Sequence, residues 1–405
     1  MGMGLGFGFL AMALHGDDFV RDWVAPFGAI FMRLLKLIAV PLVLVSLVLG
    51  VVSLKDIRNM SRIGLKTILI YVCTTIIAVS IGLVTVNLIK PGQLFPKDKQ
   101  TEFVERYQQT VTERQSQMQQ VMDDSPLQFV VDMVPENVFE AFSSNSNMLQ
   151  VIFFALIFGV ALICVGQSRT ASVVRFFQQL NLILLKIIDF IMAFAPIGVF
   201  ALMAALIVDY AGDLGIISAL GMYALTVVLA LAVIIFLVYP TLLRVFSKKK
   251  LGQFFKAVFP VQMLAFSTSS SAATLPLTME RTQKHLGVSE EVSSFVLPVG
   301  VTINMDGTSC YQAVAAVFLA QVIGLDLTFG QMLLILATAT ISSIGTPGIP
   351  GGSIVMLMIV LDSVGIQIEG LALILGIDRP LDMLRTVVNV TGDTTVACIV
   401  DDTKK

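Results

Sequence analysis

Charged side chains are scarce in this sequence. Asp, Glu, Lys and Arg make up only 13% of its 405 residues, about half the share of a typical soluble domain, which excludes an ordinary soluble enzyme and a disordered regulator. Neither sign dominates, since 26 basic residues stand against 28 acidic ones, so no positive field is available to hold nucleic acid. Hydrophobic residues are abundant instead, at 56% with a mean hydropathy of +0.88, and they predict a polytopic membrane protein.

Cysteine is also rare, and its pattern excludes a disulfide framework or a cysteine metal site. No C-x-x-C pair and no regular spacing occurs, so we interpret each cysteine as a small hydrophobic residue. The four cysteines lie apart in apolar stretches: Cys73, Cys164, Cys310 and Cys398.

Long apolar runs account for most of the chain. A helix needs about 20 apolar residues to cross the hydrocarbon core. A short run at 4–14 is followed by longer ones at 26–54, 64–89, 127–166, 175–208, 214–243, 251–284, 290–324, 328–363 and 368–400. No basic segment or small-residue cleavage site marks the start, so we expect a short first membrane helix and not a removable signal.

The charges between the runs indicate the orientation. Basic residues gather around 55–66, 169–175, 244–256 and 281–284, whereas the loops at 209–213 and 325–330 carry acids and no Lys or Arg. By the positive-inside rule the basic loops are cytoplasmic, and we expect both termini there. The polar stretch 91–126 is then an extracellular loop, and its mixed charges are typical of a solvated insertion.

Two apolar regions break this alternation. Region 251–284 has basic loops on both sides and is interrupted by Ser and Thr at 267–271, whereas 328–363 has loops without Lys or Arg on both sides and a Gly/Pro-rich break at 345–352. A segment that enters and leaves on one side is re-entrant, and its non-helical backbone must be buried in protein or line a cavity. We therefore expect hairpin 1 (251–284) and hairpin 2 (328–363) to enter from opposite sides.

Each expected hairpin precedes a full span, 290–324 or 368–400. This repetition in opposite orientation is the inverted-repeat pattern of secondary transporters, whose binding site lies between the two halves. The alternative, two ordinary spans with polar kinks, would spoil the charge alternation.

The last span carries charged residues that a lipid-facing helix would not tolerate, since each costs roughly 2.5–3.5 kcal/mol at mid-membrane. Their spacing of three and four places Asp378, Asp382, Arg385, Asn389 and Asp393 on one face, which we expect to face the protein interior. A purely structural ion-pair stripe is the alternative, but one arginine cannot neutralise three acids. Cations from elsewhere are therefore expected. By the same helical periodicity, Arg379 is expected to point away from this face.

The span 290–324 contains a polar break at 299–308. Unwinding there would free backbone carbonyls, and hard cations prefer oxygen ligands. Asn304 and Asp306, beside Asn389 and Asp393, would offer the oxygens that a sodium ion needs. A tight turn at Asp306-Gly307 is the alternative interpretation.

Arg385 is a natural anchor for a substrate carboxylate because its planar group accepts two oxygens and stays charged. Asp382, one turn earlier, could hold an ammonium group, and the backbone N–H groups of 269–271 and 348–351 could bind an α-carboxylate. This combination suits a dicarboxylic amino acid better than a plain dicarboxylate, which Asp382 would repel.

Four motifs occur in order: SSSAATLP at 269–276, NMDGT at 304–308, SIGTPGIPG at 343–351 and DMLRTVVNVTGD at 382–393. With them the chain resembles the dicarboxylate/amino acid:cation symporter family, the glutamate transporter homologues, over essentially its whole length. The resemblance implies an all-α polytopic membrane protein with eight transmembrane helices, two re-entrant helical hairpins and inverted-repeat organisation. It also implies a homotrimer.

In that family pattern, residues 1–250 would mostly form the scaffold and trimerisation helices, with the third and sixth spans partly accompanying the moving part. Residues 251–405 would form the core of a transport domain that moves as an elevator.

The resemblance also implies roles for single residues. Arg385 would bind the side-chain carboxylate of the substrate, Asp378 would orient Arg385, and Asp382 would take the ammonium group. Further substrate contacts would come from Ser270, Ser271, Thr308, Ile349, Gly351, Thr386 and Asn389.

Three sodium sites are implied. The first would use Gly300, Asn304, Asn389 and Asp393, the second Thr302 with Ser343, Ile344 and Thr346, and the third Tyr71, Thr74 and Thr75 with Asn304 and Asp306.

The chain departs from the family at Ser269 and Met383, where archaeal and animal members respectively carry an arginine. Arg379 is the nearest substitute. Ser353 stands where glycine is frequent.

The sequence thus predicts a sodium-coupled symporter of aspartate or glutamate in the plasma (inner) membrane. It would not be an enzyme, and it would need no cofactor besides the coupled sodium. A proton-coupled C4-dicarboxylate carrier would be expected to lack acids at Asp382 and Asp393, and a neutral amino-acid carrier to lack Arg385. An intramembrane serine hydrolase would need a base near the serines, but His15 and His285 lie outside the apolar runs. A passive channel would not need hairpins.

Overall fold

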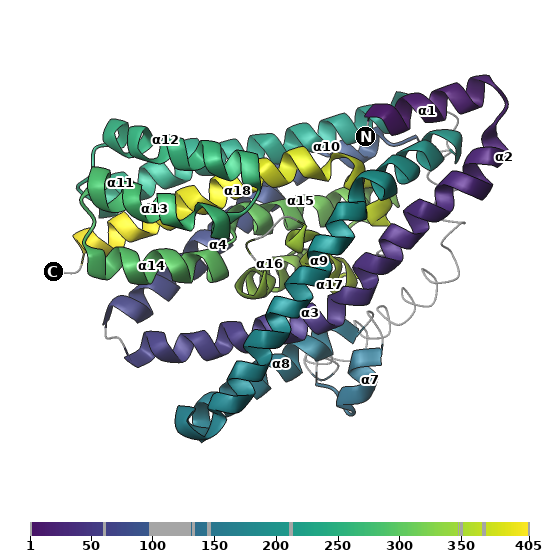
Figure 1. Ribbon diagram of the computed structural model, residues 1–405. Coiled ribbons are helices and arrows are strands. Elements are labelled where there is room, and N and C mark those ends of the chain that lie inside the picture. Colours follow the sequence, from purple (N-terminus) through teal and green to yellow (C-terminus); the bar gives the residue numbers. More distant parts are fainter. Residues whose placement is uncertain are drawn as a thin grey trace.

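The computed structural model describes residues 2–59, 62–96, 131, 134–143, 147–209, 214–346, 348, 351–366 and 370–403. Every regular element in these ranges is a helix (Figure 1). Four described stretches are long and apolar enough to cross a membrane, 17–52, 64–94, 168–205 and 215–246. The described part of the chain is therefore all-helical and rich in apolar helices, as expected for a helical membrane protein. Most of the expected loop 91–126 lies outside the described residues.

One group of helices is built around the two longest. Helix α3 (Ala25–Asn59) and helix α9 (Gln167–Asp209) run side by side. Glycines allow the close approach, since a Cβ on Gly198 would collide with the ring of Phe31. The shorter members around this pair are α1 (Gly2–Ala13), α2 (Asp17–Phe19), η1 (Val20–Val24), α7 (Val138–Ser143) and α8 (Met148–Val165).

A second group surrounds the C-terminal helix α18 (Leu371–Asp402), which packs against helices on all sides and is buried along most of its length. Its neighbours include α4 (Arg62–Ile89), α10 (Leu214–Val233), η4 (Ile234–Val238) and α11 (Tyr239–Phe246); η2 (Pro91–Leu94) follows α4. The π-helical turns η1 and η4 each end two residues before a proline, Pro26 or Pro240. Proline lacks an N–H and displaces the carbonyl four residues earlier, so the hydrogen-bond ladder widens there.

Each expected hairpin region contains two helices that pack against each other. Hairpin 1 consists of α12 (Leu251–Thr268) and α13 (Ser271–Leu286), with Ser269 in the left-handed region at φ +51° and the Ser270 hydroxyl capping α13 at the Ala273 N–H. Hairpin 2 consists of α16 (Phe329–Gly345) and α17 (Gly352–Ser363), with Gly351 at φ +80°.

The region 290–324 is two helices, α14 (Glu290–Ile303) and α15 (Asp306–Val322). Asn304 and Met305 separate them, so the polar break predicted inside this run is present. Helix α18, in contrast, stays helical through Pro380.

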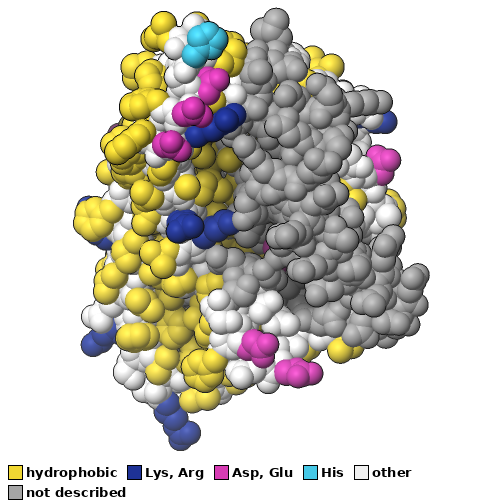
Figure 2. Space-filling view, turned by 90° about the vertical axis from the view of Figure 1, so that its right-hand side faces the viewer, with side chains coloured by type: hydrophobic (Ala, Val, Ile, Leu, Met, Phe, Trp, Pro, Cys, Tyr) yellow, Lys and Arg dark blue, Asp and Glu magenta, His cyan; other side chains and the backbone are white. Residues whose placement is uncertain are grey.

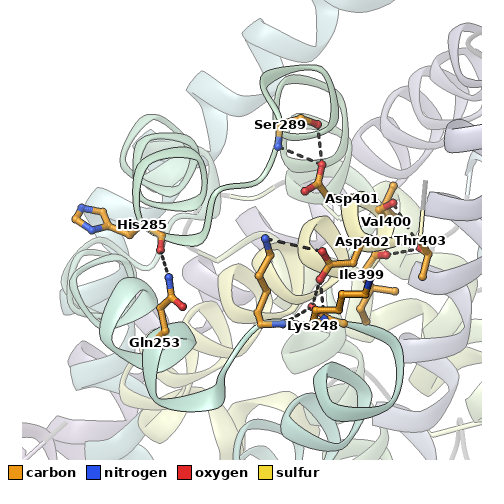
Figure 3. Close-up of polar contacts among 11 residues, drawn as sticks. Lys248, Gln253, His285, Ser289, Ile399, Val400, Asp401, Asp402 and Thr403 are labelled. Carbon is orange, nitrogen blue, oxygen red and sulfur yellow. Dashed lines mark hydrogen bonds and ion pairs between the residues drawn. The ribbon is translucent and has the colours of Figure 1, made fainter. Parts of the chain in front are cut away.

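The C-terminal end of α18 is fastened to two loops (Figure 3). Asp402 Oδ2 accepts hydrogen bonds from Ser247 Oγ at 2.6 Å and from the Lys248 N–H at 2.8 Å. Asp401 Oδ1 accepts one from Ser289 Oγ at 2.7 Å. These five residues, named the C-terminal clasp, tie both ends of hairpin 1 to α18.

Hydrophobic side chains remain exposed on the outside of the long helices. Leu88, Leu182 and Phe236 are each at least two-thirds exposed, and Figure 2 shows hydrophobic side chains over a large part of the face in view. Exposed apolar surface of this extent on a single chain is typical of contact with lipid or with other subunits.

Candidate functional site

Arg385 lies at the centre of a buried group of charges on α18. Its Nη1 is 2.9 Å from Asp378 Oδ1 and its Nη2 is 2.8 Å from Asp382 Oδ1. Nη2 also donates to Ser353 Oγ of hairpin 2 at 3.0 Å. All of these residues are at most 6% exposed. The face of α18 expected to point inward is therefore buried, and it contacts hairpin 2 directly.

The guanidinium group of Arg385 is also stacked on an aromatic ring. Its central carbon lies 3.8 Å from the ring centroid of Tyr311 on α15, where the ring stabilises a desolvated cation. Arg385 Nε is buried and has no hydrogen-bond partner among the described residues. The Nε–H donor of the guanidinium thus remains available.

Arg379 does not behave as its helical position suggested. Its side chain is 52% exposed, yet Nη1 lies 3.7 Å from Asp382 Oδ2. The expectation that Arg379 points away was wrong in this respect, because an i,i+3 spacing lets two long side chains meet across the face. Asp382 therefore lies between two arginines.

A small cavity lies beside this group of charges, where four parts of the chain meet. The two hairpin tips touch at its edge, with Ser270 Oγ donating to the Gly348 carbonyl at 2.8 Å and the Ala272 N–H donating to the same oxygen at 3.3 Å. Most of the residues that line the cavity are polar. The lining residues are Ser269, Ser271, Met305, Thr308, Thr346, Gly348, Ser353, Asp382, Thr386 and Asn389.

Most of the expected substrate residues lie at this cavity or directly behind it. Ser271, Thr308, Asp382, Thr386 and Asn389 line it, and Arg385 and Asp378 lie behind Asp382 in the same ion pairs.

Two of the remaining expected substrate residues, Ser270 and Gly351, are described but do not line the cavity. Ser270 bonds the tip of hairpin 2. Gly351 packs against α9, where Met192 Sδ would be 2.5 Å from an added Cβ. Ile349 lies outside the described residues.

A second buried polar group surrounds Asp306 at the start of α15. Its Oδ1 accepts hydrogen bonds from Thr75 Oγ1 at 2.8 Å and Thr74 Oγ1 at 3.3 Å. Its Oδ2 accepts one from Tyr239 Oη at 2.9 Å. Asp306 is fully buried, and no lysine or arginine of the described chain forms an ion pair with it.

Asp393 belongs to the same region. Its Oδ1 accepts a hydrogen bond from Asn304 Nδ2 at 2.8 Å, and Asn304 Oδ1 is buried with no partner among the described residues. Gly300 must be a glycine here, since a Cβ would collide with Asp393 Oδ1 and lie 2.5 Å from Tyr71 Oη. The residues expected for the first and third sodium sites thus lie together around the break in 290–324; we call them, with Tyr239, the cation cluster: Tyr71, Thr74, Thr75, Tyr239, Gly300, Asn304, Asp306, Asn389 and Asp393.

The residues expected for the second sodium site are only partly assembled. Ser343 Oγ donates to the Ile303 carbonyl at 3.3 Å, beside the break, and Thr346 lines the cavity. Thr302, however, is exposed and its hydroxyl bonds the Val299 carbonyl of its own helix. The Ile344 carbonyl packs against Gly50 of α3.

The donor atoms of the cation cluster are carboxylate, amide, hydroxyl and carbonyl oxygens. No group of three or more His, Cys, Asp or Glu side chains converges within the described ranges. Such a set suits a hard cation of low charge better than zinc or another transition metal.

Sequence reasoning missed two site residues and recognised a third only as a departure from the family. Tyr239 and Tyr311 were hidden because a tyrosine in an apolar span also reads as ordinary packing. Ser353 stood out only as a replacement for glycine, and its bond to Arg385 was not foreseen. A hydroxyl group inside an apolar span was the available signal in each case.

Comparison with known proteins gives a consistent result. The model of the sodium:dicarboxylate symporter family matches residues 1–403. The proton/sodium-glutamate symport protein of Bacillus caldotenax is 36% identical over 401 residues, covering 98% of this chain and 92% of the relative.

Two further relatives come from other lineages. The proton/glutamate-aspartate symporter of Escherichia coli (strain K12) is 32% identical over 398 residues, covering 96% of this chain and 89% of the relative. Excitatory amino acid transporter 3 of Oryctolagus cuniculus is 35% identical over 415 residues, covering 93% and 79%.

Proposed function

Because this chain belongs to the sodium:dicarboxylate symporter family, and is therefore a transporter and not an enzyme, we propose that it carries aspartate or glutamate across the membrane together with sodium. The similar proteins are named as symporters of glutamate, or of glutamate and aspartate, with protons or with protons and sodium. The choice of an acidic amino acid and of sodium for this chain rests on its own buried charges.

The single observation that carries the proposal is an excess of buried carboxylates. Asp306, Asp378, Asp382 and Asp393 are all at most 6% exposed, and Arg385 is the one buried arginine among the described residues. Four aspartates against Arg385 and the half-exposed Arg379, which lies 3.7 Å from Asp382, leave at least two negative charges. An unpaired buried charge costs several kcal/mol, so the site is complete only when cations enter with the substrate.

Sodium fits the two carboxylates that Arg385 does not reach. Asp306 and Asp393 are surrounded by hydroxyl and amide groups, and Asn304 Oδ1 offers an unused oxygen. Oxygen ligands of this kind replace the hydration shell of a hard cation. The acidic substrate would then meet a site whose negative charge has been reduced.

Arg385 would hold the substrate by exchanging partners. Both of its terminal nitrogens now bond aspartates, so an incoming carboxylate would take one of these positions. Asp382, released from Arg385, would be free to bind the ammonium group of the same substrate. The exchange keeps the guanidinium paired throughout, which avoids an uncompensated buried charge.

Movement would follow the elevator scheme. The helices around α3 and α9 would form a fixed scaffold, and residues 251–405 with α4 and α10 would carry the site. The scaffold would hold a homotrimer with cytoplasmic termini in the plasma (inner) membrane. The ion pair between Lys186 and Asp189, both at least 60% exposed near the middle of α9, supports a covered scaffold face, since charges at membrane depth avoid lipid.

The alternative is proton coupling, favoured by the names of several relatives. The two are separated by uptake of radiolabelled aspartate into proteoliposomes, with an imposed sodium gradient in one set and a proton gradient in the other. We expect sodium to drive accumulation. Uptake that follows the proton gradient and ignores sodium would overturn sodium coupling.

A pair of variants ties the result to the site. Asp393→Asn removes one carboxylate from the cation cluster and should strongly reduce sodium-driven uptake. Asp326→Asn removes an exposed acid from the α15–α16 loop and should leave uptake unchanged.

A further inference from the structure

Tyr239 joins the cation cluster to the helix that carries the substrate anchor. Tyr239 is the first residue of α11 and is fully buried. Its hydroxyl lies close to two acceptors on different elements. Building on the function proposed above, we propose that Tyr239 is a positioning residue that couples cation binding at Asp306 to the substrate face of α18.

The two acceptors compete for a single proton. Tyr239 Oη lies 2.9 Å from Asp306 Oδ2 and 3.3 Å from the carbonyl oxygen of Val388. A phenol donates only one hydrogen bond, and the bond to an ionised carboxylate is the stronger of the two. With Asp306 free of a cation, the proton therefore points to Asp306.

The chain is shaped around this hydroxyl. The π-helical turn η4 and Pro240 place Tyr239 where the ladder of the helix is widened, a feature that recurs at functional sites. On the opposite side, a Cβ on Gly392 would lie 2.6 Å from Tyr239 Oη and 2.8 Å from Asn304 Nδ2. Glycine at 392 therefore keeps space for a polar group and not for a methyl group.

Val388 is directly connected to the substrate cavity. The next residue, Asn389, accepts a hydrogen bond from the Gly307 N–H at 2.8 Å and donates to Thr308 Oγ1 at 3.3 Å. A Cβ on Gly307 would lie 2.9 Å from Val388 Cβ and 2.5 Å from the Arg385 carbonyl. The turn 385–389 of α18 thus presses on the start of α15 without a gap.

These contacts give two arrangements of one group. A cation bound at Asp306 would neutralise part of the carboxylate charge that attracts the Tyr239 hydroxyl proton. The hydroxyl would then donate to the Val388 carbonyl instead. That bond holds the turn which carries Arg385 and Asn389 in the position that receives the substrate. Each ligand then favours the arrangement that the other needs, and this is a coupling free energy.

The test measures aspartate affinity of the purified full-length protein by isothermal titration calorimetry at limiting and at saturating sodium. The ratio of the two dissociation constants is the coupling factor. In Tyr239→Phe we expect this factor to fall at least tenfold, which corresponds to about 1.4 kcal/mol. The loss should appear at saturating sodium, where the Tyr239 hydroxyl would hold the turn 385–389, and a tenfold change lies within the range of typical couplings. Affinity at limiting sodium should change by less than about threefold, because the hydroxyl then bonds Asp306 and the ring stays in place.

Tyr223→Phe is the matched control. Tyr223 is also fully buried, and its ring stacks on Phe318 with centroids 4.6 Å apart. The Tyr223→Phe variant removes a buried tyrosine hydroxyl outside the cation cluster, so this variant should keep the wild-type coupling factor. A structural defect would lower both affinities or the melting temperature without changing their ratio.

An unchanged coupling factor in Tyr239→Phe overturns the inference. If that variant does not fold, Gly392→Ala decides, since the added methyl group displaces the hydroxyl and should lower the same ratio; a wild-type ratio there also overturns it. A wild-type protein whose aspartate affinity ignores sodium would instead refute the proposed function, so the two failures are distinguishable.

Discussion

The two hairpins each consist of two packed helices and meet at the cavity, but they are held in different ways. In hairpin 1, polar bonds join the two arms far from the tip, with Gln253 Nε2 donating to the His285 carbonyl at 2.8 Å and Arg281 Nε to the Ala257 carbonyl at 3.0 Å. The C-terminal clasp fixes both of its ends to α18 (Figure 3). Hairpin 1 is therefore braced at the end far from its tip.

Hairpin 2 is held mainly by contacts with other elements, including the bonds from Ser309 Oγ to the Ala339 carbonyl at 3.3 Å and from Ser342 Oγ to Gln312 Oε1 at 3.1 Å along α16. Its arms share apolar packing and one hydroxyl pair, Thr338 with Ser363 at 3.3 Å, and α17 is almost completely buried. The polar bonds of its tip go to other elements, from Ser270 to the Gly348 carbonyl and from Arg385 to Ser353.

The difference indicates which hairpin can respond to the site. Bonds at the tip of hairpin 2 involve residues at the cavity, so a substrate that takes Arg385 changes them directly. Bonds that brace hairpin 1 lie far from the cavity and are unaffected. We therefore expect hairpin 2 to open and hairpin 1 to act as a fixed wall.

The largest effect is expected from Arg385→Ala, which cuts the link between α18 and hairpin 2. It leaves Asp378 buried without its cationic partner and Asp382 with only the half-exposed Arg379. Losing one partner of a buried ion pair costs about 3–5 kcal/mol. Calorimetric titration should show that aspartate binding is lost, whereas sodium binding at Asp306 and Asp393 should survive in part.

Arg379→Ala is the control on the same helix. Its side chain is half exposed and 3.7 Å from Asp382, so solvent screens the pair and aspartate affinity should change only a few-fold. Aspartate affinity that is unchanged in Arg385→Ala would show that the anchor has been assigned wrongly.

A smaller effect is expected from Gly351→Ala at the tip of hairpin 2. The left-handed backbone at φ +80° costs an alanine about 1–2 kcal/mol, and the methyl group would strike Met192 Sδ. We expect a closed hairpin 2 to become less stable and aspartate affinity to fall about tenfold. Adding Met192→Ala should restore part of the loss.

The contrast with hairpin 1 is tested by Arg281→Gln, which removes a brace between its arms. This variant should lower the melting temperature in detergent and leave aspartate affinity unchanged. A loss of affinity equal to that of Gly351→Ala would remove the distinction between the hairpins.

The smallest effect is expected from Asp402→Asn in the C-terminal clasp, beyond the expected span 368–400. Partial burial raises the pKa of the Asp402 carboxyl, but hydrogen bonds from Ser247 and the Lys248 N–H, with the charge of Lys249, outweigh it and hold the pKa below its ordinary value. The folded protein thus binds this proton more weakly than the unfolded chain does. The resulting stability is present above about pH 3.9 and is lost as the pH falls through the lowered pKa.

Thermal unfolding as a function of pH checks this. At neutral pH the Asp402→Asn variant should be less stable by about 0.5–1 kcal/mol, and the difference should shrink on acidification below about pH 4. A stability difference between wild type and Asp402→Asn that grows as the pH falls would contradict a lowered pKa of Asp402.

Much of the arrangement followed from where the sequence places its few charges and its helix breakers. The break at Asn304 was predictable because an amide and an acid interrupt an apolar run, and the buried face of α18 because charges at intervals of three and four are too costly in lipid. Exposing a charge or an amide to lipid costs much free energy, so such residues occur almost only at positions that face the protein interior, and this makes them recognisable in the sequence.

What could not be predicted depends on contacts between distant segments. Nothing local separates Tyr239, bonded to Asp306 across 67 positions, from a tyrosine that only packs. The direction of the Arg379 side chain depends on which of several staggered rotamers it adopts, and the helical position alone does not fix that choice. Helical periodicity gives the face of a residue but not the reach of a long side chain.

The π-helical turn η4 before Tyr239 also sets the direction in which the side chains of α11 point. A turn of this kind accommodates one residue more than a regular helix over the same length, and one residue rotates an α-helix by about 100°. Deleting a single residue from Ile234–Val238 would therefore turn α11 and carry Tyr239 away from Asp306. If Tyr239 couples the cation cluster to α18 as proposed, such a deletion should lower the coupling factor even though every residue of the cation cluster is kept.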